Sequence, residues 1–272
     1  MTAAVPAIQC IALSEATCYW RERIRLAESL ALFLDFDGTI SPIVAKPELA
    51  AIDPQIKNTL ERLRDLSGVH IAIISGRELS DVRARAGIDG VIYAGNHGLE
   101  IETDSLCFRE PRAESMRLEL RRLVLRLQVL LAETTGIEIE DKGLSVAVHY
   151  RHVHEALHDW VRRSVAETVC KSQAFSHMFG KMVVDIRPKV DWNKGYAVKW
   201  LLERFSSQAP YPILIGDDVT DEDAFVALAG QALTIHVGES QRTSARFWVP
   251  DVCAVRAFLS AVYELRSSEK RH

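Results

Sequence analysis

Cysteine is scarce in this sequence: the chain has five cysteines in 272 residues, and no two of them form a C-x-x-C pair. Cysteine-based zinc sites use such closely spaced pairs, and disulfide frameworks join cysteines in even numbers. We therefore exclude both and expect reduced thiols, buried as small hydrophobic side chains in a cytosolic protein. The five residues are Cys10, Cys18, Cys107, Cys170 and Cys253.

The chain also lacks a large excess of one charge and any long apolar run. Lys and Arg total 33 against 37 Asp and Glu, which gives a net charge of −4. A protein that follows a nucleic-acid backbone is normally strongly basic, so we expect no nucleic-acid partner. Uncharged apolar runs such as 30–34 and 71–74 are far shorter than the ~20 residues that span a bilayer. We therefore expect no membrane partner.

The remaining composition is that of a globular protein. Hydrophobic residues make up 48% of the chain and charged residues 26%, and no segment is repeated or low in complexity. No basic residue precedes Arg21, so the N-terminus lacks the charged region with which a signal peptide begins. These features predict a cytoplasmic α/β protein, which we expect to be a monomer.

Buried-strand patterns alternate with helix patterns at both ends of the chain. The predicted strands are 31–36, 69–74, 90–94, 212–215 and 233–237. The predicted helices are 15–28, 54–66, 79–86, 196–205, 221–228 and 252–266. Such regular alternation predicts an α/β fold with a doubly wound, Rossmann-like parallel sheet.

The middle of the chain has a different pattern. Two long amphipathic helices are predicted at 113–134 and 154–171, with strands at 137–140 and 144–150 and two more within 175–187. The order βαββαββ indicates a small sheet with helices on one face. We place this inserted α/β domain at 99–189, so that residues 1–98 and 190–272 form the core.

The motif that most strongly suggests chemistry is Asp35-Phe36-Asp37-Gly38-Thr39, directly after the first predicted strand. Ligands of doubly wound sheets bind at the carboxyl ends of the strands, and alternation along an extended segment places both carboxylates on one side. Gly38 lets the chain turn with its backbone N–H groups free to meet an anion. The alternative is an ordinary Asp-Gly turn after a strand.

Three further polar groups follow predicted strands or precede a predicted helix. Ser75 offers a hydroxyl, although it could simply be a helix N-cap. Lys194 precedes a helix, where a lone lysine is usually exposed to solvent. Asp217 and Asp218 follow the strand 212–215, whereas Asp221 and Glu222 fit an ordinary acidic helix start.

Together these residues predict phosphoryl transfer. Oxygen ligands without histidine or cysteine suit Mg²⁺, which binds together with a substrate phosphate. A cation, an ammonium group and a hydroxyl neutralise the oxygens of a phosphoryl group in transfer. One aspartate can attack phosphorus while the second handles protons. The chain has no nucleotide P-loop motif.

The sequence resembles the haloacid dehalogenase (HAD) superfamily, whose four motifs match Asp35-x-Asp37-Gly38-Thr39, Ser75, Lys194 and Gly216-Asp217-Asp218. The predicted insertion corresponds to the cap of that superfamily. More narrowly, the chain is similar to the trehalose-6-phosphate phosphatases. The stretches that carry this resemblance are 34–43, 74–77, 94–100, 140–151, 180–188, 192–195 and 216–222.

The resemblance implies roles for individual residues. Asp35 would be the nucleophile and a Mg²⁺ ligand, and Asp37 the general acid and base, with its carbonyl on the metal. Asp217 would be the third protein ligand of the metal. Ser75 and Lys194 would hold the phosphate.

The resemblance also implies residues that bind the sugar phosphate. Glu140 and Lys142 match cap residues that grip the distal glucose. Asp185 stands where the family usually has Glu, and its shorter side chain indicates a shifted or water-mediated sugar contact. Further substrate-binding residues are expected in the family-typical stretches, namely Arg77, Asn96, His97, Gly98 and Arg151.

The function that we predict is Mg²⁺-dependent hydrolysis of trehalose 6-phosphate through an aspartyl phosphate. The nearest alternative is a sister phosphatase acting on sucrose 6-phosphate or a glycosyl-3-phosphoglycerate. A remote alternative is a non-catalytic regulator, which would accept a phosphoryl group or bind a sugar. The receiver domains that accept phosphoryl groups are near half this length, and their acidic pair precedes the phosphorylated Asp by a strand and a helix.

Overall fold

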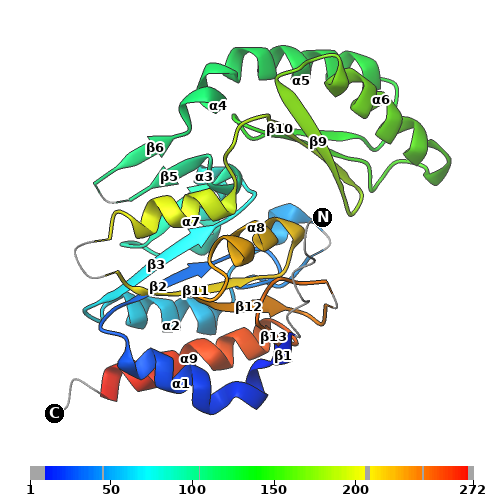
Figure 1. Ribbon diagram of the computed structural model, residues 1–272. Coiled ribbons are helices and arrows are strands. Elements are labelled where there is room, and N and C mark those ends of the chain that lie inside the picture. Colours follow the sequence, from blue (N-terminus) through cyan, green and yellow to red (C-terminus); the bar gives the residue numbers. More distant parts are fainter. Residues whose placement is uncertain (1–9, 45, 104, 206–208, 241, 269–272) are drawn as a thin grey trace, which may run out of the picture. The chain divides into compact units, whose positions relative to one another are not determined.

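The computed structural model describes residues 10–44, 46–103, 105–205, 209–240 and 242–268. The chain divides into two compact units, a larger one of Met1–Cys107 with Trp192–His272 and a smaller one of Phe108–Asp191 (Figure 1). The predicted boundaries, after 98 and 189, both lie earlier in the chain. The difference at the first boundary arises because residues 100–102 pair with a strand of the larger unit.

The larger sheet has the strand order β1-β13-β12-β11-β2-β3-β4-β5-β6, and all of its strands except β6 lie wholly within the larger unit. Neighbouring strands from β1 to β4 are parallel, and β5 runs antiparallel to β4. This is the predicted doubly wound α/β architecture. The strands are β1 (Ile11–Ala12), β2 (Leu30–Leu34), β3 (Val69–Ile74), β4 (Ile92–Gly95), β5 (Glu100–Glu102), β6 (Cys107–Arg109), β11 (Tyr211–Gly216), β12 (Leu233–Val237) and β13 (Phe247–Val249).

Helices cover both faces of this sheet, which explains why every residue of β2 is buried. Side chains of α1, α2, α3 and α9 share one hydrophobic cluster with the strands, while α7 and α8 cover the opposite face (Figure 1). The helices are α1 (Thr17–Leu26), α2 (Pro54–Arg64), α3 (Leu79–Ala86), α7 (Lys194–Leu202), α8 (Val219–Ala227) and α9 (Val252–Ser268).

The predicted core elements are confirmed, with shifts at their ends. The segment 15–28 begins as the 3₁₀ turn Leu13–Ala16 before α1, and α7 begins at Lys194 because Asn193 accepts a hydrogen bond from Tyr196 N. The short strands β1 and β13 were not predicted, and the strand expected before the helix at 113–134 was given no residue range. Strands this short contain too few residues to show an alternating pattern.

The smaller unit contains a four-stranded antiparallel sheet in the order β7-β8-β10-β9. Helices α5 and α6 pack on one face of it around a hydrophobic cluster. The first strand of the predicted βαββαββ order joins the larger sheet instead. The elements are α4 (Pro111–Ser115), α5 (Arg117–Leu131), β7 (Glu138–Asp141), β8 (Val146–His149), α6 (His158–Cys170), β9 (Phe175–Gly180) and β10 (Val183–Pro188).

Two expectations about these elements are wrong. The single helix expected at 113–134 is two helices, because the chain leaves the helical pattern at Met116, where no Gly or Pro signals a break. The cysteines are free, as expected, but they are not buried: Cys10 is partly exposed and the other four are exposed. In the described part of the chain, no helix is long and apolar enough to cross a membrane.

Candidate active site

Asp35 and Asp37 lie just beyond β2, at the carboxyl edge of the larger sheet. The Asp35 backbone N–H donates to the carbonyl of Ile215 at 2.9 Å, which extends the pairing of β2 with β11. Asp35 is only 8% exposed. Gly38 follows with a φ of +78°, and a Cβ there would lie 2.1 Å from a carboxylate oxygen of Asp217. Glycine is therefore required for the two loops to meet.

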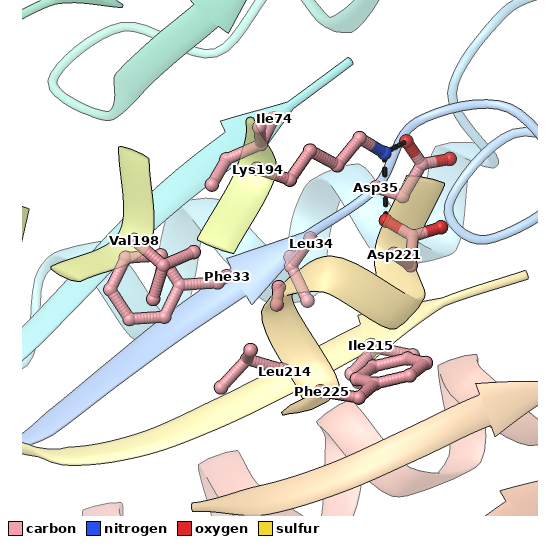
Figure 2. A pocket seen from close by; sticks show the side chains of 11 residues that line it. Phe33, Leu34, Asp35, Ile74, Lys194, Val198, Leu214, Ile215, Asp221 and Phe225 are labelled. Carbon is pink, nitrogen blue, oxygen red and sulfur yellow. Dashed lines mark hydrogen bonds and ion pairs between the residues drawn. The ribbon is translucent and has the colours of Figure 1, made fainter. Parts of the chain in front are cut away.

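Lys194 connects Asp35 to α8. Its ammonium group donates to Asp35 Oδ1 at 2.5 Å and to Asp221 Oδ1 at 2.7 Å (Figure 2). The aliphatic part of the lysine lies among apolar side chains from β2, α7, β11 and α8, and the residue is 2% exposed. Lys194 is therefore a buried cation with two carboxylate partners rather than the exposed lysine that is usual at a helix start.

Burial and charge work against each other in this cluster. Burial raises the pKa of Asp35 well above its usual value, more than Lys194 lowers it, and the charges of Asp221 and Asp217 raise it further. Burial alone would lower the pKa of Lys194, but Asp221 and Asp35 together raise it. The lysine therefore stays protonated while the carboxyl groups compete for a positive partner.

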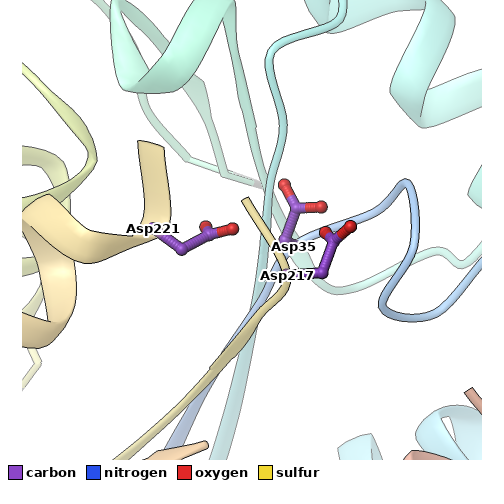
Figure 3. A group of neighbouring side chains, drawn as sticks. All are labelled: Asp35, Asp217 and Asp221. Carbon is purple, nitrogen blue, oxygen red and sulfur yellow. The ribbon is translucent and has the colours of Figure 1, made fainter. Parts of the chain in front are cut away.

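Asp217 brings a third carboxylate to the same place. One oxygen each from Asp35, Asp217 and Asp221 lie within 4.8 Å of one another (Figure 3). Burial and the nearby charge of Asp221 raise the pKa of Asp217 to about 7. Three carboxylates around one point, with one ammonium group between two of them, form a site that is short of positive charge.

The raised pKa of Asp217 predicts a stability change that can be measured. The folded protein binds this proton more tightly than the unfolded chain, so metal-free protein loses stability as the pH rises from about 4 to about 7. Asp217→Asn cannot ionise and should melt on the order of 5 °C above wild type at pH 8 in chelator. The gap in Tm should shrink at pH 5, and calorimetry that found an equal gap at both pH values would contradict the charge repulsion.

Asp221 is a site residue that the sequence patterns did not single out. Its Oδ2 accepts from the backbone N–H of Asp218 at 3.1 Å in a capping box, as the helix-start interpretation predicts. Its Oδ1 meanwhile accepts from Lys194. One carboxylate thus caps α8 and also holds the buried lysine. Its position one turn after Asp217 was a usable signal, because a helix that starts at the sheet edge turns this residue back towards the site.

Ser75 and Arg77 follow β3, the neighbour of β2. Ser75 is 1% exposed, and its hydroxyl accepts from Arg77 N at 3.2 Å. It does not cap α3, whose N-cap is Glu78. The Arg77 guanidinium donates Nε to Asp37 Oδ2 at 2.7 Å and Nη2 to Asp37 Oδ1 at 2.8 Å. The residue that was expected to bind substrate therefore holds the Asp37 carboxylate with two hydrogen bonds.

The turn after β4 lies against the Ser75 loop. The N–H groups of Asn96 and His97 donate to the carbonyls of Arg77 and Ser75 at 2.7 and 2.8 Å. Asn96 and His97 both have positive φ, 50° and 58°, which costs energy in non-glycine residues and is common at functional sites. A Cβ on Gly76 would lie 2.4 Å from the His97 ring, so a larger residue there would have to displace that ring.

The next residue, Gly98, is also fixed by close packing. Its φ is +92°, and a Cβ there would lie 2.4 Å from the Cβ of Ala197. The Gly98 carbonyl accepts from Trp192 Nε1 at 2.7 Å. The turn 96–98 is therefore held in one conformation between the Ser75 loop and the start of α7.

The other expected substrate residues lie in the smaller unit. Glu140 on β7 and Asp185 on β10 are both directly paired with Ala147 on the strand between them. Both side chains therefore lie on the face of the sheet that α5 and α6 do not cover. Glu140 Oε2 lies 3.0 Å from His149 Nε2 and 3.7 Å from Lys142 Nζ. Arg151, just past β8, is exposed. His149 was not predicted as a site residue. It lies two residues after Ala147 in β8 and is therefore on the same face of the sheet.

The chain is similar in sequence to known proteins. A trehalose-phosphate phosphatase of Mycobacterium tuberculosis (strain ATCC 25618 / H37Rv) is 35% identical over 235 residues, which cover 83% of this chain and 59% of that protein. The chain thus spans about three fifths of the length of this relative.

Two solved structures share the fold. The crystal structure of a trehalose-6-phosphate phosphatase related protein has a TM-score of 0.77 at 25% identity and covers 88% of this chain and 99% of its own. A haloacid dehalogenase-like hydrolase from Bacteroides thetaiotaomicron has a TM-score of 0.62 at 14% identity and covers 86% and 99%. The fold is therefore HAD-like.

The family model for trehalose-phosphatases matches residues 33–251, a span that holds every candidate site residue discussed above. The resemblance in short motifs thus extends through both compact units, and the chain belongs to the trehalose-phosphatase family.

Proposed function

We propose that this chain is a Mg²⁺-dependent phosphatase that hydrolyses trehalose 6-phosphate to trehalose and phosphate. The observation that carries the proposal is the buried Asp35 carboxylate, bonded to Lys194 at 2.5 Å at the carboxyl end of β2, in a member of the trehalose-phosphatase family. A carboxylate in this setting has a nucleophilic oxygen and a fixed cation beside it to receive a phosphate.

The acidic cluster fits a magnesium ion. All of its ligand atoms are oxygens, and the raised pKa values of Asp35 and Asp217 show that the positive charge of Lys194 does not outweigh the effect of their burial. Asp35 and Asp217 would hold the ion, with the Asp37 carbonyl as the ligand implied by family resemblance and Asp221 as the nearest further carboxylate. When bound, the ion neutralises charge on the phosphate oxygens.

The first chemical step uses Asp35 and Asp37. An Asp35 carboxylate oxygen attacks phosphorus, and the bond from phosphorus to the sugar C6 oxygen breaks. The leaving oxygen takes the proton of the Asp37 carboxyl group, so that trehalose departs as a neutral alcohol. Lys194 stays beside Asp35, where its ammonium group and the buried Ser75 hydroxyl would hold the phosphate oxygens.

The second step regenerates the enzyme. Asp37, now ionised, takes a proton from a water molecule as that water attacks phosphorus. The bond between phosphorus and the Asp35 oxygen breaks, phosphate leaves and Asp35 is again a carboxylate. Summed over both steps, one water is consumed for each phosphate ester cleaved, and Asp37 has given and recovered one proton.

A panel of phosphate esters tests this proposal. Phosphate release should be measured in Mg²⁺ with trehalose 6-phosphate, sucrose 6-phosphate, glucosyl-3-phosphoglycerate and glucose 6-phosphate. We expect kcat/KM for trehalose 6-phosphate to exceed the others by about 10-fold or more, and chelator to abolish turnover. A comparable rate with another sugar phosphate would shift the assignment to a sister phosphatase, and no turnover at all would favour a sugar-binding regulator.

Specificity for the sugar should depend on the open face of the smaller unit. Glu140→Ala should lower kcat/KM for trehalose 6-phosphate about 10-fold or more, because a hydroxyl of the substrate loses a charged partner. Hydrolysis of p-nitrophenyl phosphate, which has no second sugar, should change much less. Glu167→Ala, on the exposed side of α6, is the matched control. Equal losses on both substrates would mean that Glu140 acts in folding rather than in recognition.

A further inference from the structure

A chain of charged side chains leads from Asp37 into the first turn of α3. Arg77 contacts Asp37 with Nε and Nη2, and its third nitrogen, Nη1, donates to Asp81 Oδ2 at 2.8 Å. Asp81 in turn accepts from Arg85 Nε at 2.7 and 2.8 Å through both oxygens. Neither Asp81 nor Arg85 has a role in the proposed chemistry.

The far end of this chain is anchored to the backbone. Arg85 Nη1 donates to the carbonyls of Glu48 and Ala50 at 2.7 and 3.0 Å. The Arg85 side chain is 19% exposed and that of Arg77 is 11% exposed, whereas Asp37 at the site is 42% exposed. The network is therefore bonded to the backbone at its Arg85 end and exposed to solvent at its Asp37 end.

The charges in the network support its geometry. Burial would raise the pKa of Asp81, but the hydrogen bonds and charges of Arg85 and Arg77 outweigh burial and lower it. Burial would likewise lower the pKa of Arg77, and Asp37 and Asp81 raise it instead. Asp81 thus stays ionised and Arg77 stays protonated because of their neighbours, which favours one fixed arrangement of the guanidinium.

We propose that Asp81, fixed by Arg85, is a positioning residue that holds the Arg77 guanidinium so that it orients the Asp37 carboxyl group towards the leaving oxygen. An arginine side chain has many rotamers, and Asp81 restrains this one from the side opposite Asp37. The paired hydrogen bonds occupy one acceptor direction on each Asp37 oxygen and leave the other open to carry a proton. The inference rests on the proposed role of Asp37 as general acid.

A positioning role for the general acid predicts a particular pattern of loss. Proton donation matters most when the leaving group is a poor one, such as phenolate, and least when it is a good one, such as p-nitrophenolate. Neither phenyl phosphate nor p-nitrophenyl phosphate carries a sugar, so contacts in the smaller unit do not enter the comparison. The quantity to measure is kcat/KM, which reports on steps up to the first phosphoryl transfer.

Asp81→Ala should lower kcat/KM for phenyl phosphate about 10-fold and for p-nitrophenyl phosphate less than about threefold. Asp81→Asn, which keeps an acceptor for Arg77, should fall between wild type and the alanine variant. Arg83→Gln removes an exposed ion pair to Glu102 from the same helix and should behave as wild type on both esters. In an Asp37→Asn background, Asp81→Ala should add no further selective loss.

Equal losses on the two esters, or a selective loss that persists without the Asp37 carboxyl group, would overturn the inference. If Asp81→Ala proves too unstable to assay, the same comparison with Asp81→Asn decides the question. If wild type cleaves both aryl esters but not trehalose 6-phosphate, and Asp81→Ala still loses more on phenyl phosphate, the substrate proposal fails and the role of Asp81 stands.

Discussion

Replacing Asp35 by Asn should reduce kcat/KM for trehalose 6-phosphate by at least three orders of magnitude. The change keeps the shape of the side chain, but an amide oxygen does not attack phosphorus and cannot form the acyl phosphate. The variant should still fold, because burial already disfavours the charge of Asp35 and Lys194 keeps Asp221 as a partner. Steady-state phosphate release and a thermal melt measure the two effects.

Comparison with Asp37→Asn separates the two roles. That variant loses only acid–base assistance and should retain more activity, with a loss of roughly 10²–10⁴-fold. It should also accumulate phosphorylated protein, detectable by mass spectrometry after an acid quench, because the second step lacks its base. Activity above a few per cent in Asp35→Asn would show that another residue attacks phosphorus.

Lys194→Met should lower both the turnover and the melting temperature. Its ammonium group is the cation between Asp35 and Asp221, at 2.5 and 2.7 Å, in a site that is almost fully buried. Removing one member of such a group leaves uncompensated buried charge and costs about 3–5 kcal/mol. For a chain of this size that lowers the Tm by roughly 10 °C. Turnover should fall about 10³-fold, because the phosphate also loses its fixed cation.

A second substitution tests the cause. Adding Asp221→Asn to Lys194→Met removes one of the stranded charges while keeping an acceptor for the Asp218 N–H, so α8 remains capped. The double variant should recover part of the lost Tm in chelator but none of the lost activity. If the double variant melts as low as the single one, packing of the lysine stem rather than charge accounts for the instability.

The sequence was sufficient to predict the main elements of the fold. Strands such as β3 and β12 are short runs of mostly β-branched and apolar residues bounded by turn residues, and parallel sheets covered on both faces require such runs. The Asp-x-Asp motif was equally readable, because its position after a strand follows from local pattern alone. The same local logic failed for the exposed cysteines, because their burial depends on which face of a helix or strand meets the core.

What only the tertiary structure decided is how these residues act on one another. Lys194 and Asp221 are 27 residues apart, and Lys194 and Asp35 are 159 apart, so no local pattern joins them into one buried ion cluster. The pairing of Arg77 with Asp37 likewise depends on β2 and β3 lying side by side. Sequence determines which side chains stand at the ends of strands, because strand formation depends on nearby residues. Charge, burial and partner depend on the packing of distant segments, and these determine which of the carboxylates serve chemistry and which serve the fold.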